Sequence, residues 1–174
     1  MDEHADMRDA MPDWNNFYML VGGVAGTLIG LIFVVISLGA ERPKSGDQDR
    51  TRILVTPVLV HFATLLLIAL ALLAPISNLI RALLLGALGC AGFGYTANLA
   101  FLAKKRIDET EREVVWDTAL PLAGYFLVLV SAAAWALDAS FADEHAAIAS
   151  VLLLVTALRN NWAITLRIIR RSGV

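Results

Sequence analysis

The sequence predicts an all-α integral membrane protein, a compact bundle of five transmembrane helices with its N-terminus outside and its C-terminus in the cytoplasm. Five apolar segments are each about as long as the ~20 residues that a helix needs to cross a bilayer. The Lys and Arg residues between these segments alternate by side. Hydrophobic residues make up 58% of the chain and its mean hydropathy is +0.68, well above what the core of a water-soluble domain requires.

The predicted spans form one membrane domain over residues 17–169, and they are 17–38, 53–73, 82–103, 119–137 and 146–169. An acidic extracytoplasmic tail, 1–16, precedes the domain, and a basic cytoplasmic tail, 170–174, follows it. Because the acidic tail has neither a basic segment nor a small-residue cleavage site, we expect the first span to be a retained anchor. No segment outside the spans is long enough to bury a core of its own.

The orientation follows from the basic residues. Twelve of the 14 Lys and Arg residues fall on one side of the five-span arrangement, and Arg8 and Arg81 fall on the other. Cytoplasmic loops carry the excess of Lys and Arg, so the side with twelve is predicted to be cytoplasmic. Trp14, Tyr18 and Trp135 then lie at the outer headgroup level, which such residues favour. The expected location is the plasma membrane of a bacterial cell.

The first span carries a strip of small residues, Gly22, Gly26 and Gly30, at a spacing of four. Two helices approach closely along such a strip because no side chain separates their backbones. The partner is either another helix of the same chain or the same span of a second copy. The third span carries a similar track, Gly86, Cys90 and Gly94, so both spans are predicted to pack closely.

The second span contains Pro57 and, four residues later, His61. Polar side chains in a membrane span must face protein or water, and several others share the depth of His61 in the inner half of the bundle. They come from four spans and form a predicted inner-leaflet polar layer: His61, Tyr95, Asn98, Tyr125, Arg159, Asn160 and Asn161. The alternatives are an interhelical contact for His61 and an Arg159 that reaches the headgroups. With no carboxylate in any span, His61 is expected to be neutral at pH 7 and is a candidate proton-sensitive gate.

The connections are short and polar. Pro75, Ser77 and Asn78 form a tight turn, and 138–144 is an acidic loop, so the second and third spans, and the fourth and fifth, are expected to form antiparallel hairpins. The charged stretch 104–118 is expected to prolong the third helix, either as a solvated face or as a docking surface for a cytoplasmic partner.

No motif names a substrate, a cofactor, a metal site or a nucleic-acid partner. Three functional classes remain, and the sequence favours the first: a homo-oligomeric channel or transport-like protein for ions or small solutes. The second is a non-catalytic membrane module that binds or regulates another membrane protein. The third, an enzyme acting on lipid or quinone within the membrane, is disfavoured because no span contains Asp or Glu. Membrane lipid and further copies of the chain are the expected partners.

Overall fold

The chain is all helical over the residues that the computed structural model describes, 14–40, 48–104 and 118–171. Five helices occur there: α2 (Trp14–Ala40), α3 (Gln48–Leu73), α4 (Asn78–Lys104), α6 (Leu120–Ala136) and α7 (Ala142–Arg171). The prediction of an all-helical fold is confirmed. Residues 1–13 of the acidic tail, most of the charged stretch 104–118 and the end of the basic tail lie outside the described residues. The last three residues of the predicted acidic tail, 14–16, belong to α2.

Three of these helices contain segments long and apolar enough to cross a membrane: Trp14–Val34, Thr56–Leu73 and Asn78–Leu102. The apolar helix α6 is shorter, with 17 residues. Large hydrophobic side chains are also exposed on the outside of the bundle, among them Leu20, Phe101 and Phe126. An apolar exterior on apolar helices is typical of a protein that is solvated by lipid.

Local sequence explains where the helices begin and end. Pro75 has no backbone N–H and restricts Ala74, so α3 stops before it. Ser77 then caps α4, since its Oγ accepts a hydrogen bond of 3.4 Å from the backbone N–H of Ile80. At the end of α6, Asp138 adopts a left-handed φ of 50°, and the N–H of Ala139 bonds to the carbonyl of Ala134 at 2.9 Å.

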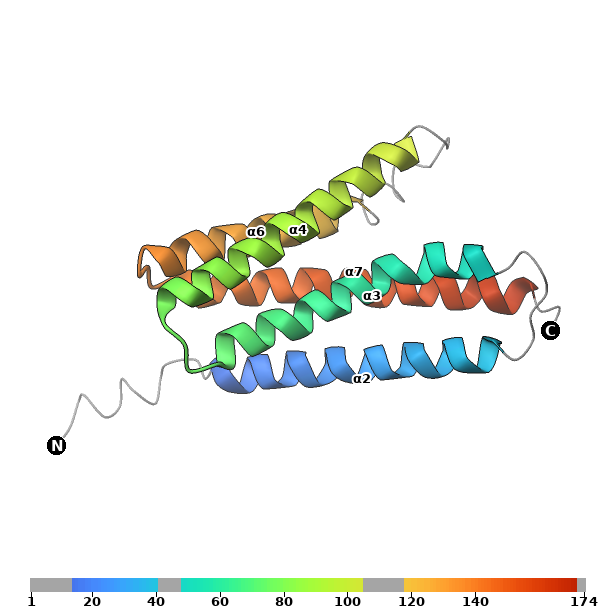
Figure 1. The fold of residues 1–174 in the computed structure, drawn as a ribbon, viewed down its shortest axis with the longest axis horizontal. Coiled ribbons are helices and arrows are strands. Elements are labelled where there is room, and N and C mark those ends of the chain that lie inside the picture. The colour runs from blue at the N-terminus through green and yellow to red at the C-terminus, as the bar shows by residue number, and fades with distance from the viewer. Residues whose placement is uncertain (1–13, 41–47, 105–117, 172–174) are drawn as a thin grey trace.

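The helices are arranged so that α3 and α7 lie in the middle, with α2 on one side and α4 and α6 on the other (Figure 1). The two connections 74–77 and 137–141 lie at the same end of the bundle as the start of α2. Helix α4 packs mainly on α6, the next helix in the chain, and less on α3, the preceding one. The three most extensive contacts, α4 with α6, α6 with α7 and α2 with α3, are all between consecutive helices, as the sequence predicted.

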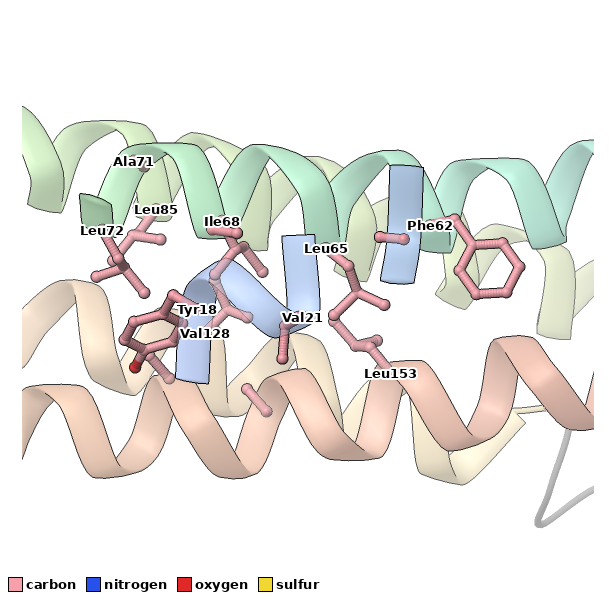
Figure 2. Packing of buried hydrophobic residues seen from close by; sticks show 14 of the residues in the cluster. Tyr18, Val21, Phe62, Leu65, Ile68, Ala71, Leu72, Leu85, Val128 and Leu153 are labelled. Atoms are coloured by element: carbon pink, nitrogen blue, oxygen red, sulfur yellow. The ribbon is translucent and has the colours of Figure 1, made fainter. Parts of the chain in front are cut away.

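The core is a continuous apolar cluster to which all five helices contribute. Tyr18, Phe62, Leu85, Val128 and Leu153, one from each helix, are almost fully buried. Figure 2 shows part of this cluster, in which the labelled side chains fill the space between the helices. Apolar side chains of the described residues thus fill the centre of the bundle.

Glycines bring α4 close to α6. A Cβ atom built on Gly89 would lie 2.7 Å from Leu129, one on Gly92 would overlap the ring of Tyr125, and one on Gly86 would lie 3.9 Å from Ala132. The packing face of α4 therefore follows a spacing of three residues. It shares Gly86 with the face that the sequence indicated, whereas Cys90 is exposed and Gly94 faces open space.

The glycine strip of α2 is divided in the same way. Gly22 lies against α3, because a Cβ atom placed there would be 3.1 Å from the Cβ of Ala69. Gly26 and Gly30 have no such neighbour within 4 Å. One copy of the chain therefore uses the first glycine of the strip and leaves the other two uncovered.

Candidate functional site

The candidate site is a buried polar contact between α3 and α6. His61 and Tyr125 are 3% and 0% exposed, and the Nδ1 atom of His61 lies 2.8 Å from the hydroxyl oxygen of Tyr125. This distance is typical of a good hydrogen bond. Two members of the predicted polar layer, 64 residues apart in the chain, are thus brought together in the core.

Gly92 of α4 makes this contact possible. Because that residue has no side chain, the ring of Tyr125 lies directly against the α4 backbone. Helices α6 and α3 are not direct neighbours. The Tyr125 ring extends from α6 into the space between them and places its hydroxyl group beside the imidazole of His61. The rings of His61 and Tyr125 have centroids 5.6 Å apart and planes tilted by 42°.

Thr64, one turn after His61, completes the contact. Its hydroxyl donates a hydrogen bond of 2.8 Å to the carbonyl of Val60, and its Oγ1 lies 3.5 Å from the Tyr125 hydroxyl. The Tyr125 proton can point to His61 or to Thr64, and the shorter distance favours His61 as its acceptor. His61 then carries its own proton on Nε2. If Nδ1 of His61 instead donated to the Tyr125 oxygen, His61 would have to carry its proton on Nδ1. The direction of this hydrogen bond between α3 and α6 therefore depends on which ring nitrogen of His61 is protonated.

The other predicted members of the layer lie further out. Tyr95 is half-buried on α4 and close enough to Tyr125 for an electrostatic interaction. Asn98 is exposed on the same helix. Arg159, Asn160 and Asn161 are half-buried on α7. The structure therefore places His61 and Tyr125 in the core and the remaining five residues nearer the surface of one copy.

Two residues that contribute to this contact, Thr64 and Gly92, do not belong to the polar layer that the sequence predicted. Thr96 is 5% exposed on α4, and its hydroxyl oxygen has no hydrogen-bond partner among the described residues. Gly92 could be recognised only by knowing which face of α4 meets α6. Over the described part of the chain, no three His, Cys, Asp or Glu side chains gather closely enough to hold a metal ion.

No protein-family model, curated protein or solved structure matches the chain. The geometry of the helices and of their polar contacts is therefore the basis for the functional assignment.

Proposed function

We propose that all five helices cross the membrane. Helix α6 has 17 residues and so a length of roughly 26 Å, close to the ~30 Å of a hydrocarbon core. Helix α7 has 30 residues and packs on both α6 and α3. Both helices also carry exposed apolar side chains, including Phe126 and Val155. A bundle that is apolar on all sides supports insertion of α6 and α7 together with the other three.

The proposed orientation has the N-terminus outside and the C-terminus in the cytoplasm of a bacterial plasma membrane. Its support is the distribution of 14 Lys and Arg residues, twelve of which then face the cytoplasm. The connections 74–77 and 137–141 share one end of the bundle with the start of α2, as this orientation requires.

The function that the geometry supports best is a non-catalytic membrane module that acts by assembly with other membrane helices, first of all with further copies of itself. The observation that carries this proposal is the uncovered part of α2. This helix lies at the edge of the bundle and packs on α3 and slightly on α7. Its Gly22 makes a close contact with α3, while Gly26 and Gly30 leave the backbone open to a partner.

A substitution with a matched control tests this assembly. Gly26→Leu should separate the contacting helices, so the variant should have a lower mass than the wild type in light scattering of the detergent-solubilised protein. Ala133→Leu adds a side chain at an exposed position of α6 and should leave the mass unchanged. A wild-type monomer, or equal effects of the two substitutions, would contradict assembly through α2.

A homo-oligomeric channel or carrier is the second candidate, and the buried His61–Tyr125 pair favours it. A titratable group inside a membrane bundle marks a functional site by default, because its burial costs free energy. Since apolar side chains fill the centre of one copy, solute would have to pass between copies. The pair would then act as a proton-sensitive gate through the hydrogen bond that connects α3 to α6.

Flux measurements distinguish this candidate from a module that conducts nothing. Vesicles reconstituted with the wild type should show ion flux that changes as the pH is lowered through the range in which His61 takes up a proton. His61→Ala should remove that pH dependence. Flux equal to that of protein-free vesicles at every pH would exclude the second candidate.

A further inference from the structure

A second polar cluster lies at the end of the bundle where α2 begins, where α3 joins α4 and where α6 joins α7. Its centre is Arg81, the first basic residue of α4. The guanidinium donates to the carbonyls of Ala71 and Ala74 at 3.3 and 3.2 Å and to Oδ1 of Asn78 at 3.1 Å. It also stacks over the ring of Trp135, 4.4 Å from its centroid.

These contacts hold the guanidinium in place but leave donors free. A guanidinium has five N–H groups, and the three bonds to Ala71, Ala74 and Asn78 use one each. All three acceptors are neutral, and Arg81 has no ion pair within the part of the chain that the structure describes. Two N–H groups of the guanidinium have no acceptor there and can serve an anion.

A negative charge lies on the other side of the same cluster. Asp143 is half-buried near the start of α7, where its backbone carbonyl accepts a hydrogen bond of 2.8 Å from the Tyr18 hydroxyl. Its carboxylate has no hydrogen bond or ion pair within the described part of the chain. Arg81 is near enough to lower the pKa of this carboxyl group, although burial raises that pKa by more.

Between the two charges is a pocket of about 300 Å³, lined by Trp14, Asn15, Tyr18, Leu72, Arg81, Trp135 and Asp143. This volume is at the lower end of the range for small-molecule sites. The indole ring of Trp135 forms one wall of this pocket. The pocket thus offers separated positive and negative groups between aromatic walls.

We propose that this pocket binds the headgroup of an ethanolamine phospholipid, with the phosphate at Arg81 and the ammonium at Asp143. The phosphate oxygens would accept hydrogen bonds from the two free N–H groups of the guanidinium. Arginine and phosphate commonly form such a pair with two hydrogen bonds. The ammonium would donate to the Asp143 carboxylate, which a choline headgroup cannot do because its nitrogen carries no hydrogen. A headgroup that is only anionic would leave Asp143 unpaired.

Position in the membrane favours a lipid over a free zwitterion of the same chemistry. Trp14, Tyr18 and Trp135 line the pocket, and such residues lie at the headgroup level of a bilayer. The exposed apolar side chains Met19 and Leu20 of α2 and Leu83 of α4 lie within one turn of the lining residues. Acyl chains of a lipid bound in the pocket would run along these surfaces.

The proposal is tested by lipid binding to the full chain, measured by native mass spectrometry from micelles that contain one phospholipid at a time, with identical acyl chains. Phosphatidylethanolamine should bind about tenfold more tightly than phosphatidylglycerol or phosphatidylcholine. Asp143→Asn should abolish this preference, and Glu144→Gln, a change at the next and exposed residue, should retain it. Equal binding of the three lipids, or a preference that survives Asp143→Asn, would overturn the proposal.

Three further measurements keep the result unambiguous. Free phosphoethanolamine should displace the lipid only weakly; displacement at equal concentration would assign the pocket to a soluble zwitterion instead. Arg81→Gln should weaken the binding of all three phospholipids. Because this change also removes hydrogen bonds at the end of α3, the helix content of the variant is checked by circular dichroism. The mass of the assembly should not change in Asp143→Asn, which separates this proposal from the contact through α2.

Discussion

A single hydrogen bond in the core connects helices that are not direct neighbours. The His61–Tyr125 bond joins α3 to α6 across the middle of the bundle, at 2.8 Å and with both side chains almost fully buried. In lipid or in a dry core no water can replace a lost partner. The stability of the helix arrangement should therefore be sensitive to either residue.

Removal of the Tyr125 hydroxyl should destabilise the bundle. Tyr125→Phe keeps the ring against Gly92 but leaves Nδ1 of His61 without this partner, which should cost about 1–3 kcal/mol. Unfolding in mixed micelles with increasing denaturing detergent measures the change. Tyr95→Phe, at a half-buried tyrosine of α4, is the control and should have a smaller effect. Equal losses in the two variants would show that the His61 contact adds no stability.

The carboxyl group of Asp143 should make lipid binding depend on pH. Its pKa is raised by burial, which outweighs the opposite effect of Arg81, so the group takes up a proton at a higher pH than an ordinary aspartate with a pKa near 4. The ammonium ligand needs the ionised form, which is present above the raised pKa and lost as pH falls through it.

The preference for phosphatidylethanolamine should accordingly be full at pH 7 and decline on acidification before pH 4 is reached. Arg81 on α4 and Tyr18 on α2 face Asp143, and an ordinary guanidinium or phenol does not change charge in this range. His145 and Glu144 are the other ionisable side chains beside Asp143 on the same helix. Asp143→Asn serves as the control, because any pH dependence that remains in it belongs to those neighbours.

At the scale of the helices, the contact between α4 and α6 is made by glycines at a spacing of three. Gly86, Gly89 and Gly92 let Ala132, Leu129 and Tyr125 approach the α4 backbone. Gly124 of α6 has the same role toward α7, since a Cβ atom there would lie 2.9 Å from Leu153. Close approach of this kind is what holds helices together where the hydrophobic effect between them is absent.

Two glycines of α4 that are two residues apart should respond differently to the same substitution. Gly92→Ala would place a methyl group in the ring of Tyr125, and such overpacking typically costs about 1–3 kcal/mol. Gly94→Ala meets no atom within 4 Å, and because alanine is the better helix former it should be neutral or slightly stabilising. Thermal unfolding of both variants in one detergent gives the comparison, and a loss at Gly94 as large as at Gly92 would contradict this packing face.

The sequence was sufficient to locate the helices but not to predict which face of each helix packs against its neighbours. Length and hydropathy indicated five apolar segments, and each coincides with a described helix to within a few residues. The four-residue track of Gly86, Cys90 and Gly94 indicated a different face of α4, because several small residues surround that helix and spacing alone cannot rank them. Only the position of α6 shows that Gly89 and Gly92 are the covered ones.

The candidate site was predictable to a similar extent. His61 and Tyr125 were grouped by their depth in the membrane, which follows from counting residues along two helices. Depth says nothing of rotation about the helix axis, which is why Asn98 is exposed although it belongs to the same predicted layer. The pocket at the other end was not predicted, since its lining comes from all five helices.

The main feature of the whole molecule is that apolar side chains both fill its core and cover much of its exterior. Buried side chains from all five helices fill the centre, and large hydrophobic side chains such as Leu83, Phe126 and Ile148 point outward. A water-soluble protein rarely exposes so many large hydrophobic side chains. By length and composition, however, only three described helices qualify as spans on their own. The central claim is therefore that α6 and α7 also cross the bilayer.

Site-directed labelling of cysteines tests that claim most directly. In a Cys90→Ala background, which removes the one native cysteine, single cysteines are placed at Ser45 and at Ser140 and treated in intact cells with a reagent that does not cross membranes. With five spans and an external N-terminus, the cysteine at position 140 should be labelled and the one at position 45 protected until the cells are opened. If only α2, α3 and α4 crossed the membrane, position 140 would lie in the cytoplasm with position 45, so protection of both would contradict the five-span bundle.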